Sequence, residues 1–245
     1  MDIVNCDETL DDLLINGLQI IQKTKGFRFT LDAVLLAHFV SLKEGDRVVD
    51  LGSGTGIIPL LLTTRLNKIQ VTGVEIQQEM AEMANRSVEM NQLTEKITIM
   101  EGDLRNIHKS LVGGIFHVVT ANPPYGALGE GLINSEHNKA LARHEIKCSL
   151  EDVVQSASKL LNYQGRFALI HRVERLADLF TLLRQYDLEP RRLRFIHPYL
   201  GKPARHLLLE SRKKAPADLQ VLPPLVVYEK PGQYNAEILT WYGKE

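Results

Sequence analysis

Cysteine is scarce in this sequence, and long apolar runs and an excess of charge of one sign are missing. The two cysteines, Cys6 and Cys148, are too few for a disulfide scaffold and lack the spacing of metal ligands. The most apolar run, residues 57–62, is far too short to span a bilayer. The first twenty residues carry several acids, unlike the basic start of a signal peptide. We therefore expect a cytoplasmic protein that uses no metal, no membrane and no obligate protein partner.

The charges nearly cancel, because the chain has 29 Lys and Arg residues and 30 Asp and Glu residues. No global basic field exists, so a nucleic-acid surface would have to come from local clustering. Hydrophobic residues make up 44% of the chain and charged residues 24%, which is typical of folded globular proteins and excludes wholesale disorder. The length of 245 residues suits one large domain.

Apolar strand-like runs alternate with helical stretches through most of the chain. This order predicts an α/β fold: a doubly wound, Rossmann-like, mostly parallel seven-stranded sheet with an antiparallel hairpin at one edge. We predict a single domain over 1–245, with an N-terminal lead-in and helix over 1–45, a catalytic core over 46–215 and a C-terminal surface extension over 216–245. The predicted strands are 48–51, 70–75, 97–101, 115–121, 166–170, 188–196 and 206–210, and the predicted helices are 56–66, 77–91, 150–161 and 175–185.

A glycine-rich turn follows the first of these strands and opens a helix. Glycines let the backbone approach a ligand closely, and a helix N-terminus offers free N–H groups. The turn is not a dinucleotide fingerprint, because Ile57 stands where the third glycine should be, and no Gly-Lys-Ser/Thr phosphate loop is present. Its candidate ligand-binding residues are Asp50, Gly52, Ser53, Gly54, Thr55 and Gly56.

Carboxylates also end the next two strands. Glu75 lies 19 residues after Gly56, where a carboxylate can accept both hydroxyls of a ribose. Asp103 follows the third strand and can accept from the exocyclic amine of an adenine. Ile76 and Leu104, which follow these acids, complete the predicted site. Three successive strand ends thus predict a nucleoside site that needs no pyrophosphate.

This set resembles the class I S-adenosylmethionine-dependent methyltransferases. The resemblance implies that Asp50 helps to hold the amino-acid part of the cofactor and that the glycines line its homocysteine part. S-adenosylmethionine is therefore the expected cofactor.

The fourth strand ends in Asn122-Pro123-Pro124-Tyr125. The Asn122 side-chain oxygen and the Pro123 carbonyl can each accept a hydrogen bond from an N–H group of a poorly nucleophilic amine. Proline fixes the direction of that carbonyl. Tyr125 can stack on a planar acceptor. We therefore predict Asn122, Pro123 and Tyr125 as catalytic residues, with Asn122 also beside the cofactor. The motif suits adenine N6, guanine N2 and glutamine amides alike.

Three features narrow the acceptor. Only about 45 residues precede the cofactor motif, leaving no room for the helical domain of the glutamine methyltransferases that act on release factors, and the tail is too short for a large DNA-recognition domain. The tail is also locally basic, with interleaved aromatics, a pattern that suits RNA binding and equally suits an ordinary solvated hairpin. The candidate RNA-binding residues are Tyr125, Arg143, Arg192, Arg194, Lys202 and Arg205.

Three further segments extend the resemblance to nearly all of residues 5–215. They are residues 26–37, 142–145 and 194–205. With them the chain resembles the bacterial tRNA adenine-N6 methyltransferases that modify the base just 3′ of the anticodon in a valine tRNA. The resemblance implies methylation of an adenine N6 in the anticodon loop of a tRNA. A protein glutamine amide, a guanine N2 in RNA and a non-enzymatic RNA-binding role remain the alternatives.

Overall fold

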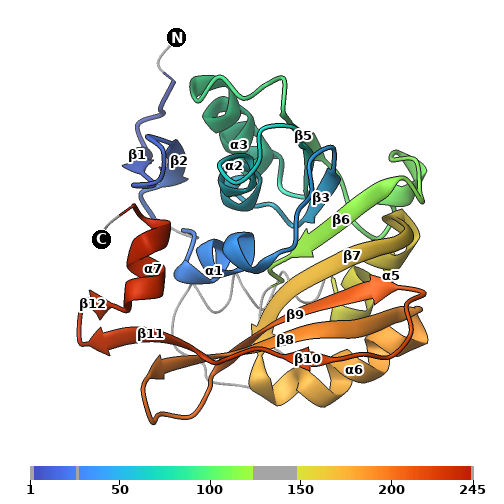
Figure 1. The fold of residues 1–245 in the computed structure, drawn as a ribbon. Helices are drawn as coiled ribbons and strands as arrows, with labels where there is room; N and C mark the ends of the chain where they lie inside the picture. Colours follow the sequence, from blue (N-terminus) through green and yellow to red (C-terminus); the bar gives the residue numbers. More distant parts are fainter. Residues whose placement is uncertain (1–2, 26–27, 124–147, 244–245) are drawn as a thin grey trace.

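A computed structural model gives the fold of the chain and describes residues 3–25, 28–123 and 148–243 (Figure 1). A ten-stranded sheet forms its centre, with strand order β12-β11-β8-β9-β7-β6-β3-β4-β5 and β10 beside β8. Seven of its strands are β3 (Arg47–Leu51), β4 (Gln70–Glu75), β5 (Ile97–Glu101), β6 (Phe116–Ala121), β7 (Leu161–Arg172), β8 (Leu188–Tyr199) and β9 (His206–Lys213).

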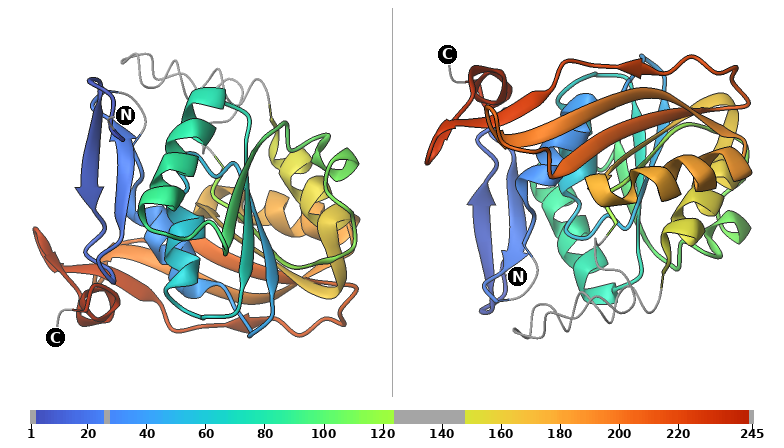
Figure 2. Two further views of the ribbon diagram at one scale, coloured as in Figure 1. Left: turned by 90° about the horizontal axis from the view of Figure 1, so that it is seen from above. Right: turned by 90° about the horizontal axis from the view of Figure 1, so that it is seen from below.

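Helices cover both faces of this sheet, as Figure 2 shows from above and below. One layer holds α1 (Leu31–Phe39), α2 (Ile57–Thr63) and α3 (Gln78–Met90), and the other holds α5 (Leu150–Leu160) and α6 (Leu176–Gln185). Val48 packs with the first layer and Val49 with the second, because successive side chains of a strand point to opposite faces. Burial on both faces explains the continuous apolar character of β3 and β6, and the predicted doubly wound fold is confirmed.

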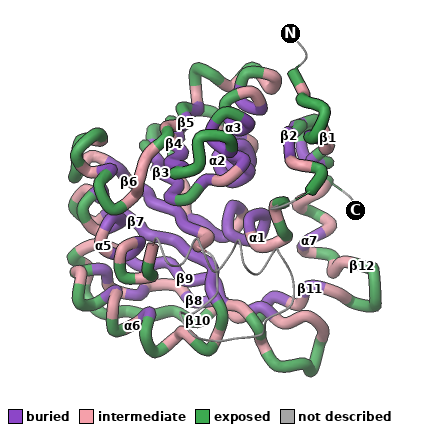
Figure 3. Tube along the Cα trace, turned by 180° about the vertical axis from the view of Figure 1, so that it is seen from behind, coloured by how far each residue is buried: buried purple, intermediate pink, exposed green. Residues whose placement is uncertain are grey.

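The buried residues follow this two-sided core, concentrated along β7 and β9 and in α2, with exposed residues on the outer loops (Figure 3). β9 is antiparallel to both β7 and β8, so the predicted antiparallel hairpin is also confirmed. β8 therefore runs parallel to β7, β6 and β3, and all four strands end at the same edge of the sheet.

The sheet has three more strands than the seven predicted. They are β11 (Leu225–Lys230) and the two-residue strands β10 (Gln220–Val221) and β12 (Gln233–Tyr234), which lie in the segment predicted as a surface extension. Leu225 and Ile238 of this segment are buried in the same core as α1. Ile238 belongs to helix α7 (Ala236–Trp241), whose Trp241 ring stacks on His38 with centroids 4.6 Å apart. Prolines interrupt the sequence here and hide the short strands from periodicity.

The N-terminal lead-in folds into a hairpin of β1 (Glu8–Asp12) and β2 (Gln19–Lys23), a separate two-stranded sheet. Ile21 is fully buried against α3, and its backbone N–H donates to the Ser87 hydroxyl at 3.0 Å. Glu8 forms an ion pair with Arg86 of α3 at 2.7 Å, which lowers the pKa of Glu8 to about 2. These long-range contacts fix a hairpin whose acidic sequence alone gives little sign of a strand.

Within the described ranges, no helix has the length and apolar character needed to cross a membrane. The same part of the chain contains no group of three His, Cys, Asp or Glu side chains that could hold a metal ion.

Candidate active site

The glycine-rich turn joins β3 to α2 at the carboxyl edge of the sheet. The backbone N–H groups of Gly52 and Ser53 both donate to the carbonyl of Val74, at 2.8 and 3.0 Å, which ties the turn to β4. Gly52 has a φ of +75°, in the left-handed region that favours glycine, and a Cβ built on it meets nothing within 4 Å. A Cβ on Gly56 would lie 3.1 Å from Ala84 of α3. The turn thus packs closely against α3 and leaves open space beside Gly52.

Glu75 ends β4 next to this turn. Its two carboxylate oxygens accept backbone hydrogen bonds, one from Gly54 and one from Gln77, both at 2.9 Å. The residue is only 5% exposed, so its orientation is set by the fold. Each carboxylate oxygen has a second lone pair that can still accept a hydroxyl. The geometry is therefore compatible with the predicted binding of a ribose.

Asp50 is completely buried beneath the turn. Its Oδ1 accepts a hydrogen bond from the Thr120 hydroxyl at 2.7 Å, while its Oδ2 has no partner among the described residues. Burial raises the pKa of Asp50 to about 7. The hydroxyl of Thr55, which is 1% exposed, has no partner in the described part of the chain either. Unpartnered buried polar atoms are uncommon in folded proteins, and two of them here suit the polar group of a bound ligand.

The third strand end carries the predicted adenine acceptor. The Asp103 carboxylate binds the guanidinium of Arg105, with Oδ2 2.9 Å from Nε, and this contact lowers the pKa of Asp103. An adenine amine would therefore share this carboxylate with Arg105. Ile76 is 42% exposed at the end of β4, where its apolar side chain is free to pack on a flat ring. Leu104 is half-buried, and its carbonyl accepts from the Ser156 hydroxyl at 2.7 Å.

Asn122 and Pro123 follow β6 at the same edge. The β3–β6 register pairs Leu51 with Ala121. Gly52 and Asn122 follow these two residues, so they lie side by side where the two neighbouring strands end. Both Asn122 and Pro123 are half-buried. The structure thus brings the predicted acceptor residues to the predicted cofactor turn. Pro124, Tyr125 and Arg143 lie outside the described residues.

The predicted phosphate-binding arginines have partners within the chain. Arg192 donates to the Ser41 hydroxyl at 2.6 Å and to the Phe39 carbonyl at 3.2 Å, and its guanidinium lies 4.5 Å from the centroid of the Phe39 ring. Arg194 binds both carboxylate oxygens of Glu237, at 2.6 and 2.7 Å.

These contacts hold the C-terminus of α1 and the N-terminus of α7 against the sheet. Arg192 and Arg194 therefore have structural roles that the local basic pattern did not indicate. Lys202 and Arg205, in the turn between β8 and β9, are exposed and remain the accessible members of the predicted set.

Sequence reasoning also missed Thr120, the partner of Asp50. The available signal was a lone hydroxyl in the apolar run Phe116–Ala121, at a position completely buried in the sheet. A buried threonine needs a hydrogen-bond partner, and a neighbouring strand that carries a buried aspartate can supply one.

Comparison with known proteins adds independent evidence. The family model described as "Methyltransferase small domain" matches residues 31–174. A tRNA1(Val) (adenine(37)-N6)-methyltransferase of Porphyromonas gingivalis is 32% identical over 221 residues, which cover 86% of this chain and 85% of that protein. An enzyme of the same name from Tolumonas auensis is 27% identical over 210 residues, with 85% of each chain covered.

Solved structures agree on the fold. A predicted O-methyltransferase from Agrobacterium tumefaciens has a TM-score of 0.70 and 27% identity, with 86% of this chain and 95% of that one covered. A geranyl diphosphate C-methyltransferase from Streptomyces coelicolor has a TM-score of 0.53 at 13% identity, covering 74% of this chain and 78% of that one, which shows a shared fold alone. The chain therefore belongs to the methyltransferase small domain family and, within it, groups with the tRNA1(Val) (adenine(37)-N6)-methyltransferases.

Proposed function

We propose that this protein is an S-adenosylmethionine-dependent methyltransferase that acts on the exocyclic N6 amine of an adenine in a tRNA anticodon loop. The base is the adenine just 3′ of the anticodon of a valine tRNA, the position in the names of the relatives. The observation that carries the proposal is the placement of Asn122 and Pro123 beside the Gly52 turn. A tRNA substrate also favours a cytoplasmic location.

Three features of the residues around the turn support S-adenosylmethionine as the ligand. The open space beside Gly52 would admit the ligand, and the unpartnered Asp50 Oδ2 and Thr55 hydroxyl suit its polar amino-acid part. Glu75 would hold the ribose, and Asp103 with Ile76 the adenine. When bound, this cofactor supplies a methyl group on a positively charged sulfur, which makes the methyl carbon electrophilic.

The protein's own part in the reaction is to position the acceptor nitrogen. Nitrogen on an aromatic ring is a poor nucleophile because its lone pair is delocalised into the ring. Hydrogen bonds from its two N–H groups to the Asn122 side-chain oxygen and the Pro123 carbonyl favour a more pyramidal, electron-rich nitrogen. They also aim the lone pair and accept positive charge that develops on the amine, so the interaction strengthens in the transition state. Tyr125 would stack on the adenine ring.

The raised pKa of Asp50 predicts a pH-dependent affinity for the cofactor. The positively charged amino group of S-adenosylmethionine favours the ionised carboxylate, which is the minor form of the free protein below a pKa of about 7. The affinity should therefore rise between pH 5.5 and 7, by up to about tenfold per pH unit, and level off above that range. Calorimetric titration at several pH values measures this. Asp50→Asn should bind weakly with little dependence on pH over the same range, and an equal slope in that variant would rule out Asp50.

The exposed turn predicts a salt-dependent affinity for tRNA. Removing one phosphate contact should reduce the slope of log affinity against log salt concentration by about 0.7–0.9. We expect that change for Lys202→Ala and again for Arg205→Ala, measured by fluorescence anisotropy with labelled tRNA. Lys109→Ala removes an exposed charge from the turn after β5 and serves as the control. Equal slopes for all three variants and the wild type would contradict the assignment.

The direct test combines the purified protein, S-adenosylmethionine with a labelled methyl group and a transcript of tRNA1(Val). The proposal predicts label in N6-methyladenosine after digestion to nucleosides, and no label in a transcript whose adenine 3′ of the anticodon is replaced by guanine. Label in N2-methylguanosine, or in methylglutamine when a cell extract is supplied, would assign the acceptor elsewhere.

A further inference from the structure

The turn between β8 and β9 faces the start of β11 across a hollow of about 430 Å³. Its walls are mostly apolar and include the side chains of His197, Leu200, Lys202, Pro203, Pro224 and Val226. Leu200 is 87% exposed at the tip of the turn, more than any other large hydrophobic side chain in the described part of the chain. Leu200 is not isolated, because it shares the lining with Pro203, Pro224 and Val226, and a contiguous exposed apolar patch of this kind is typical of a contact with a partner.

The turn that presents Leu200 is held in one shape. The backbone N–H of Lys202 donates to the carbonyl of Tyr199 at 3.1 Å, and Gly201 has a φ of +75°, which together define a tight β-turn. Nδ1 of His197 lies 2.6 Å from the carbonyl of Lys202, so the imidazole is fixed across the base of the turn. The hollow is therefore formed before a partner arrives, which lowers the entropy cost of binding.

The residues that line the hollow include Lys202 and no acidic side chain. No Asp or Glu occurs between residues 190 and 209, whereas Lys202 and Arg205 are exposed in that stretch. The opposite wall is formed by the uncharged Pro224 and Val226, and the exposed Glu229 further along β11 is not part of the lining. An apolar hollow with a cationic rim and no acid in its walls complements a chain of planar bases joined by phosphates.

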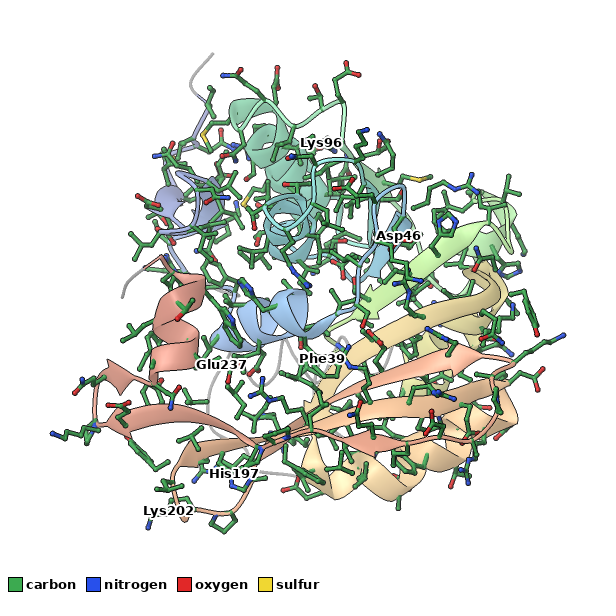
Figure 4. The ribbon with its side chains drawn as sticks, viewed as in Figure 1. Phe39, Asp46, Lys96, His197, Lys202 and Glu237 are labelled. Carbon is green, nitrogen blue, oxygen red and sulfur yellow. The ribbon has the colours of Figure 1, made fainter. Side chains whose placement is uncertain are left out.

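The topology places the hollow at the same edge of the sheet as the active site, where the parallel strands end. The register aligns one row of residues across four neighbouring strands: Ala121, Leu169, Leu209 and Leu193. Asn122 follows this row on β6, and His197 lies four residues beyond it on β8, which runs parallel to β6. In Figure 4, His197 and Lys202 lie far from Asp46, which precedes β3 at the opposite edge. Strand spacing puts the hollow roughly 20 Å from Asn122, a distance that a few nucleotides span.

We propose that this hollow receives one unstacked base of the tRNA substrate, a few nucleotides from the methylated adenine, while Lys202 and Arg205 meet the flanking phosphates. The inference rests on the proposed function, because it takes tRNA as the substrate. It adds a second contact point that sets where along the anticodon arm the target adenine enters the active site.

Leu200→Ala tests the contact without disturbing the core. The apolar area that Leu200 would bury against a base is worth enough that the KM for tRNA should rise about tenfold, whereas kcat should stay within about twofold because the hollow is remote from the reacting atoms. Val112→Ala is the matched control, since Val112 is also apolar and 68% exposed, in the loop before β6. Val112→Ala should leave both constants unchanged. Neither variant should change the affinity of the protein for S-adenosylmethionine.

A second experiment identifies which base binds in the hollow, by comparing how the wild type and Leu200→Ala bind RNAs that lack single bases. A series of anticodon stem-loops carries one abasic nucleotide at each loop position in turn, and dissociation constants are measured for the wild type and for Leu200→Ala. At one position away from the target adenine, loss of the base should weaken wild-type binding about tenfold and weaken the variant no further. Additive losses at every position would overturn the proposal.

The base site and the methyltransferase activity are tested by different results. If the wild type methylates tRNA and Leu200→Ala leaves the KM for tRNA unchanged, the hollow is not a base site and the proposed function stands. If the wild type transfers no methyl group to tRNA, the proposed function is overturned and the base site falls with it.

Discussion

Replacing Asn122 by alanine should reduce the kcat of methyl transfer by about 10²-fold or more, while the dissociation constant of S-adenosylmethionine changes far less. The reason is that the Asn122 side-chain oxygen accepts from the acceptor amine, and this hydrogen bond strengthens as positive charge develops on the nitrogen. Oriented hydrogen bonds to developing charge commonly contribute 10²-fold or more to the rate. Single-turnover kinetics with saturating tRNA and cofactor measure the chemical step directly.

The control for this experiment is Asn67→Ala. Asn67 is exposed before β4, at the opposite edge of the sheet, and its removal should leave kcat unchanged. The thermal midpoint of Asn122→Ala should stay near that of the wild type, which separates loss of chemistry from loss of folding. A variant at Asn122 that turns over at the normal rate would remove this residue from the mechanism.

Glu75→Ala should raise the dissociation constant of S-adenosylmethionine by about 10²-fold. Two effects act together. Hydrogen bonds between ribose hydroxyls and a carboxylate are each worth about 1.5–3 kcal/mol. The same carboxylate also accepts from the backbone N–H groups of Gly54 and Gln77, so its loss loosens the turn that faces the ligand. Isothermal titration calorimetry measures the change.

Glu101→Ala is a closely matched control, because the β4–β5 register pairs Glu101 with Glu75 and Glu101 is exposed. It should bind the cofactor as the wild type does. Glu75→Gln keeps one acceptor oxygen and should lie between the wild type and Glu75→Ala. Equal cofactor affinity for the alanine variants at positions 75 and 101 would show that the carboxylate of Glu75 does not hold the ribose.

The parallel core of the fold and the edge that carries the site could be predicted from the sequence. Strands β4 and β5 have the predicted bounds, since they are short apolar runs that end in polar residues and are followed by clear turn signals. Once the order of strands and helices is known, the ends of parallel strands must meet at one edge. The approach of Asn122 to Gly52 is therefore a consequence of the local pattern and the handedness of the connections.

Features that depend on contacts between distant parts of the chain could not be predicted in this way. The basic pattern of residues 191–205 gave no sign that Arg192 would cap α1 or that Arg194 would pair with Glu237. Thr120 was missed as the partner of Asp50 because the two lie 70 residues apart in the sequence. The N-terminal hairpin depends on its packing against α3, and the C-terminal strands depend on an existing edge at β8. In each case the determining interaction is tertiary.

The central claim is methylation of one adenine in one tRNA, and the most direct measurement is nucleoside mass spectrometry of purified tRNA1(Val) from cells. Three strains are compared: one with the gene for this chain intact, one with it deleted, and the deletion strain supplied with the Asn122→Ala variant. The account predicts N6-methyladenosine 3′ of the anticodon in the first strain and unmodified adenosine at that position in the other two. The same amount of N6-methyladenosine in all three strains would contradict it.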